Sequence, residues 1–267
     1  MVDSQQQRIQ QYYDTTTQWF MRFGSTRKHG SIHRALYIDR FVIDDPTQVI
    51  HYLIKQAITT HVPHAQSLLD VGCGVGASMV ALGRLLPQLT ERNGVTLSNV
   101  QADLGVRQGN NVIVASFHSL PYSDQSVDVV IAIESMIHSD QPQLFWREVR
   151  RVLRPSGMVF ICDDVLRNGS DSMIPVFQKG WHAPNLQTLE THIMHAGQQG
   201  LQLRDSVDLT CYLRLVNIPE PLMHVLAKPY DAFERYPLIT STLGSMALQH
   251  LLAVNAVSYT MMVFVRS

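Results

Sequence analysis

Glycines, carboxylates and a histidine gather at two points of the sequence where chemistry could take place. The first is Ser67-Leu68-Leu69-Asp70-Val71-Gly72-Cys73-Gly74-Val75-Gly76, in which glycines alternate with other residues after an apolar run. Glycine lets the backbone turn sharply and approach a ligand closely, and the helix expected next offers unpaired amides in its first turn. Such a loop can hold a nucleotide-containing ligand or be a plain turn, so other features must decide.

A carboxylate and a histidine form the second point, in Ile131-Ala132-Ile133-Glu134-Ser135-Met136-Ile137-His138. Glu134 follows an apolar strand, and ligands of open α/β folds bind at the carboxyl ends of the strands. A carboxylate partly removed from water gains affinity for protons and can serve as a general base. Glu134 can also be a simple capping residue at the strand end. His138 is a second candidate, although a lone histidine more often makes a structural hydrogen bond.

The segments around these two points predict the framework that positions them. Short apolar runs alternate with helical stretches from Ser67 onward, which predicts a mainly parallel sheet with helices on both faces. The expected strands are Ser67–Val71, Gly94–Leu97, Asn111–Ala115, Val127–Ile133, Met158–Cys162, Leu201–Leu209 and Ser258–Arg266. The expected helices are Ala77–Leu86, Asn99–Gln108 and Pro142–Leu153, and a further helix is expected near Asn185–Gly197. The predicted fold class is α/β, with a seven-stranded, doubly wound, Rossmann-like sheet.

Helical additions are expected at both ends of this framework. Residues 4–20 carry aromatic and apolar residues near one helical face, and a second helix is expected from Pro46 to about Thr60, with Asp45 as its N-cap. We therefore expect residues 1–60 to form a helical cap and residues 61–267 the main domain. The stretch 210–257 is longer than a simple connection requires, which predicts a cap insertion that serves binding.

The composition argues against several classes of protein. The 267 residues include 21 basic and 22 acidic ones, so the formal charge of −1 gives no electrostatic case for a nucleic-acid partner. Three widely spaced cysteines without a CxxC pair favour a reducing setting. The polar N-terminus does not resemble a signal peptide, and no apolar run approaches the length of a membrane span. We expect a cytoplasmic protein that acts on a small molecule, without a membrane partner, and that could form a homo-oligomer.

The position of the acid separates the possible ligands of the glycine-rich loop. A dinucleotide fingerprint has the spacing GxGxxG and an acid that closes the second strand. Here the spacing is GxGxG, the second strand ends in Thr96-Leu97-Ser98, and the acid precedes the glycines. LLDVGCGVG resembles the first motif of class I S-adenosylmethionine-dependent methyltransferases, in which the acid and the glycines hold the methionine part of the cofactor. The resemblance implies cofactor contacts from Asp70, Gly72, Gly74 and Gly76.

Three later motifs extend the resemblance over about residues 65–165. VTLSNVQ, at Val95–Gln101, resembles a segment beside the cofactor ribose and amino-acid end in a subgroup that includes sterol and prenyl-diphosphate C-methyltransferases. LPYSDQSVDVV and REVRRVLRPSGMVFICDD resemble the stretches around the fourth and fifth strands of the same proteins. The resemblance implies cofactor contacts from Thr96, Leu97, Gln101 and Ile133.

One departure from this pattern lies before the LPY segment. Such proteins usually carry an aspartate there that accepts from the adenine amine, whereas this chain has Ser116-Phe117. A serine hydroxyl can accept the same bond without charge assistance, so we expect a weaker cofactor contact from Ser116. Phe117 is expected to be a packing neighbour.

The string ESMIH, at Glu134–His138, resembles the glutamate-containing segment of the same C-methyltransferases. In those families the glutamate accepts a proton from, or stabilises, a carbocation that forms when an alkene is methylated. An anion beside developing positive charge is the electrostatic device that this reaction needs. The resemblance implies that Glu134 is catalytic, and His138 stays a second catalytic candidate.

The acceptor site is expected among aromatic and basic residues, mostly near the N-terminus. Aromatic faces tolerate an alkene and a cation, and basic side chains bind a diphosphate. The residues predicted to bind the acceptor are Tyr12, Tyr13, Trp19, Arg22, Phe23, His33 and Trp181. The N-terminal residues can instead form an ordinary amphipathic helix and a solvated loop. Asp163 and Asp164 could touch the substrate, or Mg²⁺ if the acceptor is a diphosphate, or they could cap the next segment. No cluster has the spacing of a dedicated metal site.

Three functions are consistent with these features. The leading hypothesis is S-adenosylmethionine-dependent C-methylation of an isoprenoid or prenyl diphosphate alkene through a carbocation. The first alternative is O- or N-methylation of a small secondary metabolite, with Glu134 or His138 as the base. The second is a cofactor-binding protein without catalysis, against which the candidate base Glu134 and the sizeable cap argue.

Overall fold

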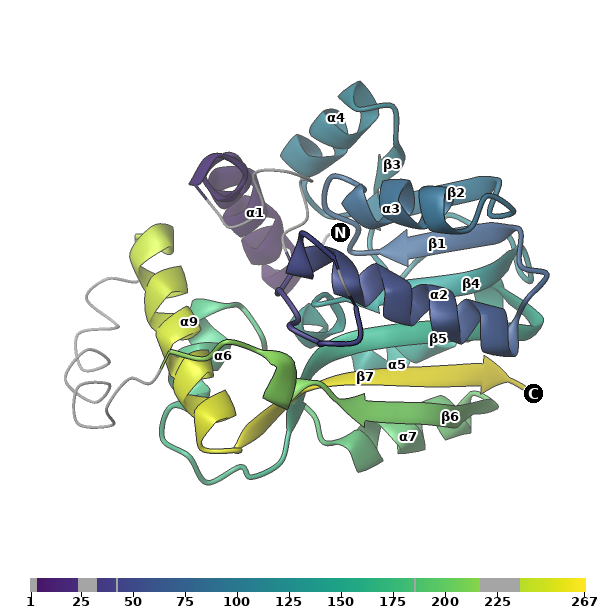
Figure 1. The fold of residues 1–267 in the computed structure, drawn as a ribbon. Coiled ribbons are helices and arrows are strands. Elements are labelled where there is room, and N and C mark those ends of the chain that lie inside the picture. The colour runs from purple at the N-terminus through teal and green to yellow at the C-terminus, as the bar shows by residue number, and fades with distance from the viewer. Residues whose placement is uncertain (1–3, 24–32, 42, 185, 217–235) are drawn as a thin grey trace.

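A seven-stranded sheet forms the centre of the protein (Figure 1). The structure, a computed structural model, describes residues 4–23, 33–41, 43–184, 186–216 and 236–267, without the side chains of residues 4 and 18–23. The strands are β1 (Ser67–Val71), β2 (Glu91–Thr96), β3 (Asn111–Val114), β4 (Val127–Ile133), β5 (Leu153–Leu166), β6 (Leu201–Asp208) and β7 (Val257–Arg266). Their order is β3-β2-β1-β4-β5-β7-β6, and β7 runs antiparallel to both of its neighbours. The predicted fold class is confirmed.

Helices cover the sheet and extend beyond its carboxyl edge. The described helices are α1 (Ser4–Phe23), α2 (Val49–His61), α3 (Ala77–Leu85), α4 (Asn99–Arg107), α5 (Pro142–Val152), α6 (Ile174–Gly180), α7 (Leu189–Gln198) and α9 (Pro237–Ala253). Three 3₁₀ turns accompany them: η1 (Pro46–Gln48), η2 (Met136–His138) and η3 (Thr210–Tyr212). No described helix is long and apolar enough to cross a membrane.

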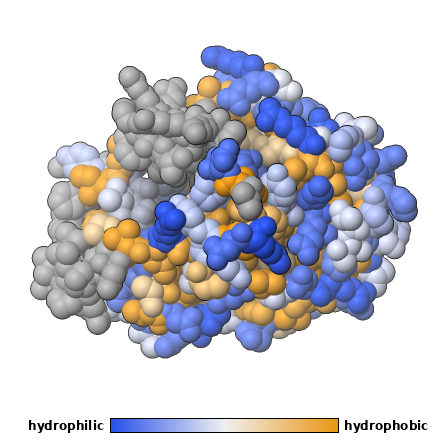
Figure 2. Space-filling view, viewed as in Figure 1, coloured by the Kyte–Doolittle hydropathy of each residue, from blue (hydrophilic) through white to orange (hydrophobic). Residues whose placement is uncertain are grey.

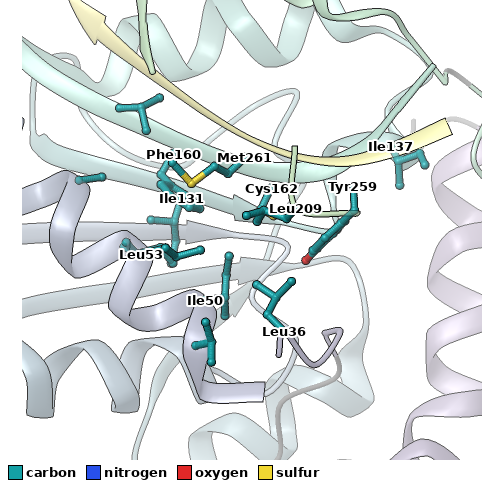
Figure 3. Packing of buried hydrophobic residues seen from close by; sticks show 14 of the residues in the cluster. Leu36, Ile50, Leu53, Ile131, Ile137, Phe160, Cys162, Leu209, Tyr259 and Met261 are labelled. Atoms are coloured by element: carbon teal, nitrogen blue, oxygen red, sulfur yellow. The ribbon is translucent and has the colours of Figure 1, made fainter. Parts of the chain in front are cut away.

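Alternating side chains of the central strands build two cores, one on each face of the sheet. Val129 and Ile131 pack with residues of α2 and α3, whereas Val130 and Ala132 pack with residues of α5 and α7. This alternation follows from the two-residue period of a strand. Figure 3 shows Ile50 and Leu53 of α2 facing the sheet residues of the first core. The outer surfaces of the helices on this side mix polar and apolar residues (Figure 2), as expected for amphipathic helices over a sheet.

β2 and β5 are longer than the sequence predicted by several residues. β2 begins at Glu91 rather than Gly94, with polar residues that carry no apolar pattern but pair with β1. β5 extends to Leu166 because its last residues pair with the start of β7, as in the pair Leu166 and Val257. Both extensions depend on neighbouring strands, so the local sequence could not predict them.

The helices at the carboxyl edge of the parallel strands come from distant parts of the chain. Figure 1 shows α1, α6 and α9 at this edge. The hydroxyls of Tyr12 in α1 and Ser241 in α9 lie 2.8 Å apart, and a Cβ at Gly180 would lie 2.7 Å from the Cα of Gly244, so α6 and α9 cross closely. Of the expected cap of residues 1–60, α1 lies at this edge, whereas α2 covers the sheet.

The order of the strands fixes where a ligand can enter. β1 and β4 are neighbours at the centre, and the chain turns toward β2 and β3 on one side and toward β5 on the other. In an open α/β sheet, such a reversal of strand order leaves a crevice outside the carboxyl ends of the strands. Both groups of predicted site residues follow these two strands: the glycine-rich loop follows β1, and Glu134 follows β4.

Candidate active site

The glycine-rich loop turns at the carboxyl end of β1. The amides of Gly72 and Cys73 donate to the carbonyl of Val95, at 2.8 and 3.0 Å. Gly72 has a φ of +82°, and a Cβ there would lie 2.3 Å from the Cβ of Ser135. Gly74 has a φ of +56°, but a Cβ there would meet nothing within 4 Å. The loop is therefore held against β2 and the end of β4, while its backbone is open at Gly74.

Asp70 lies in β1 just before this loop, and Gly76 ends the loop as the N-cap of α3. The Asp70 side chain is buried and has no hydrogen-bond partner among the described residues. Burial raises the pKa of Asp70 to about 7. A buried carboxylate without a partner is unfavourable by itself, so this arrangement fits a ligand that brings a positive charge.

The end of β2 forms a second wall beside the loop. The Thr96 hydroxyl donates to Oε1 of Gln101 at 2.7 Å, and both residues are buried. Leu97 follows the strand and is half-buried. Ser98 caps α4: its hydroxyl accepts from the amide of Gln101. The three predicted cofactor residues Thr96, Leu97 and Gln101 therefore lie together.

The remaining predicted cofactor residues lie near the ends of β3 and β4. The Ser116 hydroxyl accepts from the amide of His118 at 3.1 Å, and the ring of Phe117 packs edge-on against Phe145 at 5.5 Å. Ile133 is the last residue of β4 and packs against the first core. Ser116 thus has one local hydrogen bond, and Phe117 is a packing residue.

Glu134 lies directly after β4 in a constrained position. Its φ is +50°, a conformation that costs energy for a residue other than glycine and that is often found at functional sites. Oε1 accepts from the Tyr259 hydroxyl at 2.8 Å and from the Arg34 amide at 2.9 Å. Oε2 has no partner among the described residues. One oxygen is therefore fixed in place, and the other is available to a ligand.

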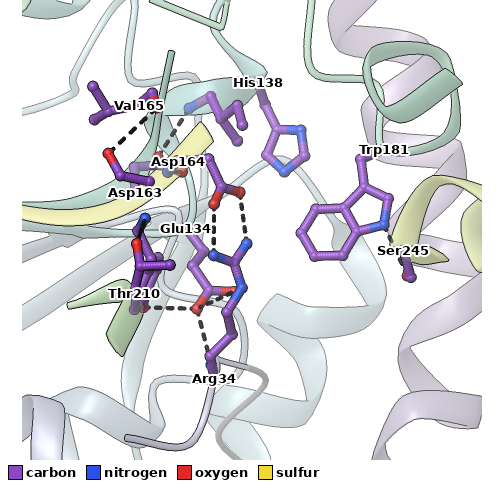
Figure 4. Close-up of polar contacts among 12 residues, drawn as sticks. Arg34, Glu134, His138, Asp163, Asp164, Val165, Trp181, Thr210 and Ser245 are labelled. Carbon is purple, nitrogen blue, oxygen red and sulfur yellow. Dashed lines mark hydrogen bonds and ion pairs between the residues drawn. The ribbon is translucent and has the colours of Figure 1, made fainter. Parts of the chain in front are cut away.

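A buried ion pair lies beside this carboxylate (Figure 4). Both Nη atoms of Arg34 donate to Asp164, each at 2.6 Å, and Nε of Arg34 lies 4.0 Å from Oε1 of Glu134. Burial alone would lower the pKa of Arg34, but Asp164 and Glu134 raise it well above its usual range. Because both oxygens of Asp164 accept from the guanidinium, Asp164 is ionised and neutralises Arg34.

Asp163, the neighbour of Asp164, is mostly protonated at neutral pH. It is buried and accepts from the amides of Ile137 and Asp164, both at 3.0 Å. Burial, and secondarily the charge of Asp164, raise the pKa of Asp163 to about 8. Among the described residues, Asp164 takes both Nη atoms of Arg34, and only the more distant Nε of Arg34 faces Glu134.

His138 in η2 is enclosed by two hydrogen bonds. Nδ1 lies 3.2 Å from the carbonyl of His182, which can only accept, so Nδ1 carries the proton. Nε2 then accepts from the Tyr13 hydroxyl at 2.8 Å. Burial lowers the pKa of His138 to about 4. His138 is therefore neutral at pH 7, with both ring nitrogens in use.

The aromatic residues predicted to bind the acceptor line different parts of this edge. Tyr12 and Tyr13 of α1 bond to Ser241 and His138, respectively. Trp181 donates to Ser245 at 3.0 Å, and its ring centre lies 5.6 Å from Cζ of Arg34. Both ring nitrogens of His33 are buried without a hydrogen-bond partner in the described part of the chain. The side chains of Trp19, Arg22 and Phe23 lie outside the described residues.

Comparison with known proteins identifies the family. Residues 69–161 match the model of a methyltransferase domain. Methyltransferase GfsG from Streptomyces halstedii is 26% identical over 223 residues, which cover 79% of this chain and 78% of that protein. Sterol 24-C-methyltransferase erg6 from Schizosaccharomyces pombe is 27% identical over 186 residues, 65% of this chain and 46% of that protein. O-methyltransferase rstn1 from Aspergillus nomiae is 35% identical over 112 residues, 39% of this chain and 49% of that protein.

The chain is a class I S-adenosylmethionine-dependent methyltransferase. It spans most of GfsG but about half of the other two relatives, so their acceptors do not transfer directly.

Solved structures show that this methyltransferase fold is shared by proteins with different reactions. Geranyl diphosphate C-methyltransferase from Streptomyces coelicolor A3(2), solved with Mg²⁺, geranyl diphosphate and S-adenosyl-L-homocysteine, has a TM-score of 0.72 at 19% identity, over 100% of this chain and 99% of that chain. The [4+2]-cyclase SpnF has the same TM-score at 20% identity, over 98% and 96%. The acceptor must therefore be inferred from the site of this methyltransferase.

The residues around the glycine-rich loop fit S-adenosylmethionine. The buried carboxylate of Asp70 can pair with its ammonium group, and the open backbone at Gly74 can lie against its methionine part. When bound, this cofactor supplies an electrophilic methyl group. No group of three or more potential metal ligands occurs among the residues that the structure describes.

Sequence reasoning missed three residues of this methyltransferase that the structure brings to the site. Tyr259 lies in an apolar strand far along the chain, and nothing in its neighbours indicates a role. Asp14 lies in α1 but contacts the start of α4. Arg34 lies among several basic residues near the N-terminus, and nothing in the sequence indicates that it donates to Asp164. The carboxylate of Asp164 bonds to Arg34, a partner that neither predicted alternative for this residue had named.

Proposed function

We propose that this methyltransferase adds a methyl group to an alkene carbon of an isoprenoid-type acceptor, through a carbocation. One observation carries the proposal: Glu134 holds a carboxylate oxygen, Oε2, that has no partner among the described residues, at the carboxyl edge of β4 and beside the ion pair of Arg34 and Asp164. A fixed negative charge stabilises a cation far better in a buried site than in water.

In the proposed reaction, a C–C bond forms to one alkene carbon as the bond from the methyl to sulfur breaks, and positive charge develops on the other alkene carbon. Glu134 stabilises this cation and accepts a proton from an adjacent carbon, whose C–H electrons restore a double bond. Tyr259 and the backbone of Arg34 hold Glu134 in position for this step. The rings of Tyr259 and Trp181 already face a guanidinium, at 4.4 and 5.6 Å, and such faces also tolerate a carbocation.

A neutral alkene fits the described charges better than a prenyl diphosphate. Arg34 is buried and bonded to Asp164, and burial lowers the pKa of His33, so neither offers a free cation to a diphosphate. A diphosphate would need other basic residues or Mg²⁺ as a counter-ion. We therefore place neutral acceptors such as sterols and polyprenyl chains first, and prenyl diphosphates with Mg²⁺ second.

The test is an acceptor panel with S-adenosylmethionine labelled in its methyl group. Neutral sterols and polyprenyl alkenes, prenyl diphosphates with and without Mg²⁺, phenols and amines are incubated with the protein, and products are located by mass spectrometry and NMR. We expect label on carbon, in a neutral alkene. Label on oxygen or nitrogen, with none on carbon, would overturn C-methylation. Label only in a diphosphate would overturn the neutral acceptor alone.

O-methylation of a small metabolite is the second candidate, because the relative rstn1, at 35% identity, is named an O-methyltransferase. A hydroxyl acceptor needs a base. His138 suits this role poorly, since both of its ring nitrogens are bonded and its pKa is about 4. Glu134 would then be the base, and the same panel would detect label on oxygen.

A further inference from the structure

The second strand of this methyltransferase ends without an acid, although a carboxylate at that place is a common way to bind ribose hydroxyls in Rossmann-like domains. The residues there are Thr96, Leu97 and Ser98. The structure brings an acid to this place from elsewhere. Oδ1 of Asp14, in α1, lies 2.5 Å from the Ser98 hydroxyl and 3.2 Å from the amide of Val100.

The side chains of Asp14 and Gln101 offer one acceptor and one donor that could bind a hydroxyl group. Ser98 Oγ donates to Asp14 and also accepts from the backbone amide of Gln101, so Asp14 and Gln101 are both bonded to this hydroxyl. Gln101 uses its Oε1 to accept from Thr96, which leaves its amide NH₂ as a donor. Neither that NH₂ nor Oδ2 of Asp14 has a partner within the described residues. A ribose hydroxyl both donates and accepts, and this pair offers one group for each bond.

We propose that Asp14 binds a ribose hydroxyl of the cofactor, as the carboxylate that β2 lacks, with Gln101 as the matching donor. Asp14 reaches this place through α1 rather than through the strand. The inference concerns the cofactor and does not depend on which acceptor is methylated.

The position of Asp14 on α1 has a consequence for the acceptor side. The two residues before it are Tyr12, bonded to Ser241 of α9, and Tyr13, bonded to His138. Docking of α1 therefore completes the ribose site and encloses the acceptor side together. Bound cofactor is expected to stabilise this docked position of α1 by the free energy of the Asp14–ribose contact.

The competing explanation is that Asp14 only fastens α1 to α4 through Ser98 and Val100. Removing a fastening weakens every ligand of the site to a similar degree. Removing a ribose contact weakens only ligands that carry the hydroxyl. Ligands that lack one hydroxyl therefore distinguish the two explanations.

The experiment is calorimetric titration with S-adenosylhomocysteine and with its 2′-deoxy and 3′-deoxy analogues. The variants are Asp14→Asn, Asp14→Ala and Ser98→Ala. The matched control is Asp103→Asn, because Asp103 is an exposed aspartate of α4, the helix that Ser98 caps. Thermal melts confirm that each variant is folded. If Asp14→Ala does not fold, the nearly isosteric Asp14→Asn and the wild type are compared on the three ligands.

We expect Asp14→Asn to weaken S-adenosylhomocysteine by roughly tenfold or more, as for a hydrogen bond to a charged group. For one deoxy analogue the same substitution should change the dissociation constant by less than about twofold, because the contact is already absent. Asp103→Asn should bind all ligands like the wild type. Equal losses for all three ligands, no loss at all, or a Ser98→Ala variant that reproduces Asp14→Asn on every ligand would each overturn the proposal.

Discussion

The cofactor half and the acceptor half of the site meet at the ends of β1 and β4, but they are built in opposite ways. Around the glycine-rich loop, backbone hydrogen bonds to Val95 fix the shape, and the buried carboxylate of Asp70 has no described partner. Around Glu134, side chains from distant segments bond to one another, and Arg34 and Asp164 satisfy each other's charge. The first half is incomplete until a ligand binds, whereas the second is largely complete in itself.

The two halves should therefore respond to different changes. A half with an unpaired carboxylate should respond to ligand charge and to pH, because the missing partner is the ligand. A half with a buried ion pair should respond to the loss of either partner, because the remaining charge is left unpaired in the interior. Substitutions that separate binding, turnover and stability can therefore test whether the two halves are distinct.

The largest effect is expected from Glu134→Gln. The amide keeps the shape and can still accept from Tyr259 and Arg34, but it removes the negative charge and the proton acceptor. We expect turnover of an alkene acceptor to fall by roughly 10²-fold or more, while the dissociation constant of S-adenosylhomocysteine changes by less than about threefold. Initial rates with labelled cofactor and calorimetry measure the two quantities.

Glu190→Gln is the matched control, since Glu190 is exposed in the first turn of α7. It should leave both quantities unchanged. Full turnover in Glu134→Gln would contradict a catalytic carboxylate and would favour transfer to an acceptor that is already nucleophilic. A large loss of cofactor affinity would instead show that the two halves are not separable.

A smaller effect, on stability, is expected from Arg34→Met. The substitution keeps the apolar stem of the side chain but leaves the charge of Asp164 buried beside Glu134. We expect the free energy of unfolding in urea at pH 7 to fall by roughly 3 kcal/mol. The double variant Arg34→Met with Asp164→Asn should recover part of this loss.

The half-exposed pair of Arg154 and Asp128 supplies the comparison for this prediction. Arg154→Met should cost about 1 kcal/mol or less, because exposed ion pairs contribute little. Equal losses of stability in Arg34→Met and Arg154→Met would contradict a buried ion pair of Arg34 and Asp164.

The smallest effect is expected from the pH dependence of cofactor binding. Burial raises the pKa of Asp70 to about 7, so Asp70 is half protonated at neutral pH in the free protein. A ligand that places its ammonium group beside Asp70 binds the ionised form, so its binding lowers this pKa and its affinity rises with pH through 7. We expect S-adenosylhomocysteine to bind about tenfold more weakly at pH 6 than at pH 8, from the ionised fraction of a group with this pKa.

Asp70→Asn should bind more weakly at pH 8 and should show a flat profile over the same range. Calorimetric titration at several pH values measures both. An unchanged slope in Asp70→Asn would mean that another group, rather than the unpaired carboxylate of the cofactor half, controls binding.

The sheet and the cofactor half were predictable from the order of the residues. The apolar runs from Ser67 onward predict the strands of the sheet. The alternating glycines predict a sharp turn of the backbone, which the structure has at Gly72. The placement of Glu134 at the end of β4 also followed from its strand, since the carboxyl ends of parallel strands share one edge. These features depend on residues that are neighbours in the chain.

The residues that surround Glu134, and the residue that faces the end of β2, depend on contacts between distant segments of the chain. Tyr259 and Arg34 lie 125 and 100 positions from Glu134, and Asp14 lies 84 positions from Ser98. No local pattern specifies such contacts, because they depend on how β7 pairs with β5 and where α1 docks. The same contacts show that His138 is enclosed and Arg34 neutralised, and both conclusions need distances that the order of residues does not contain.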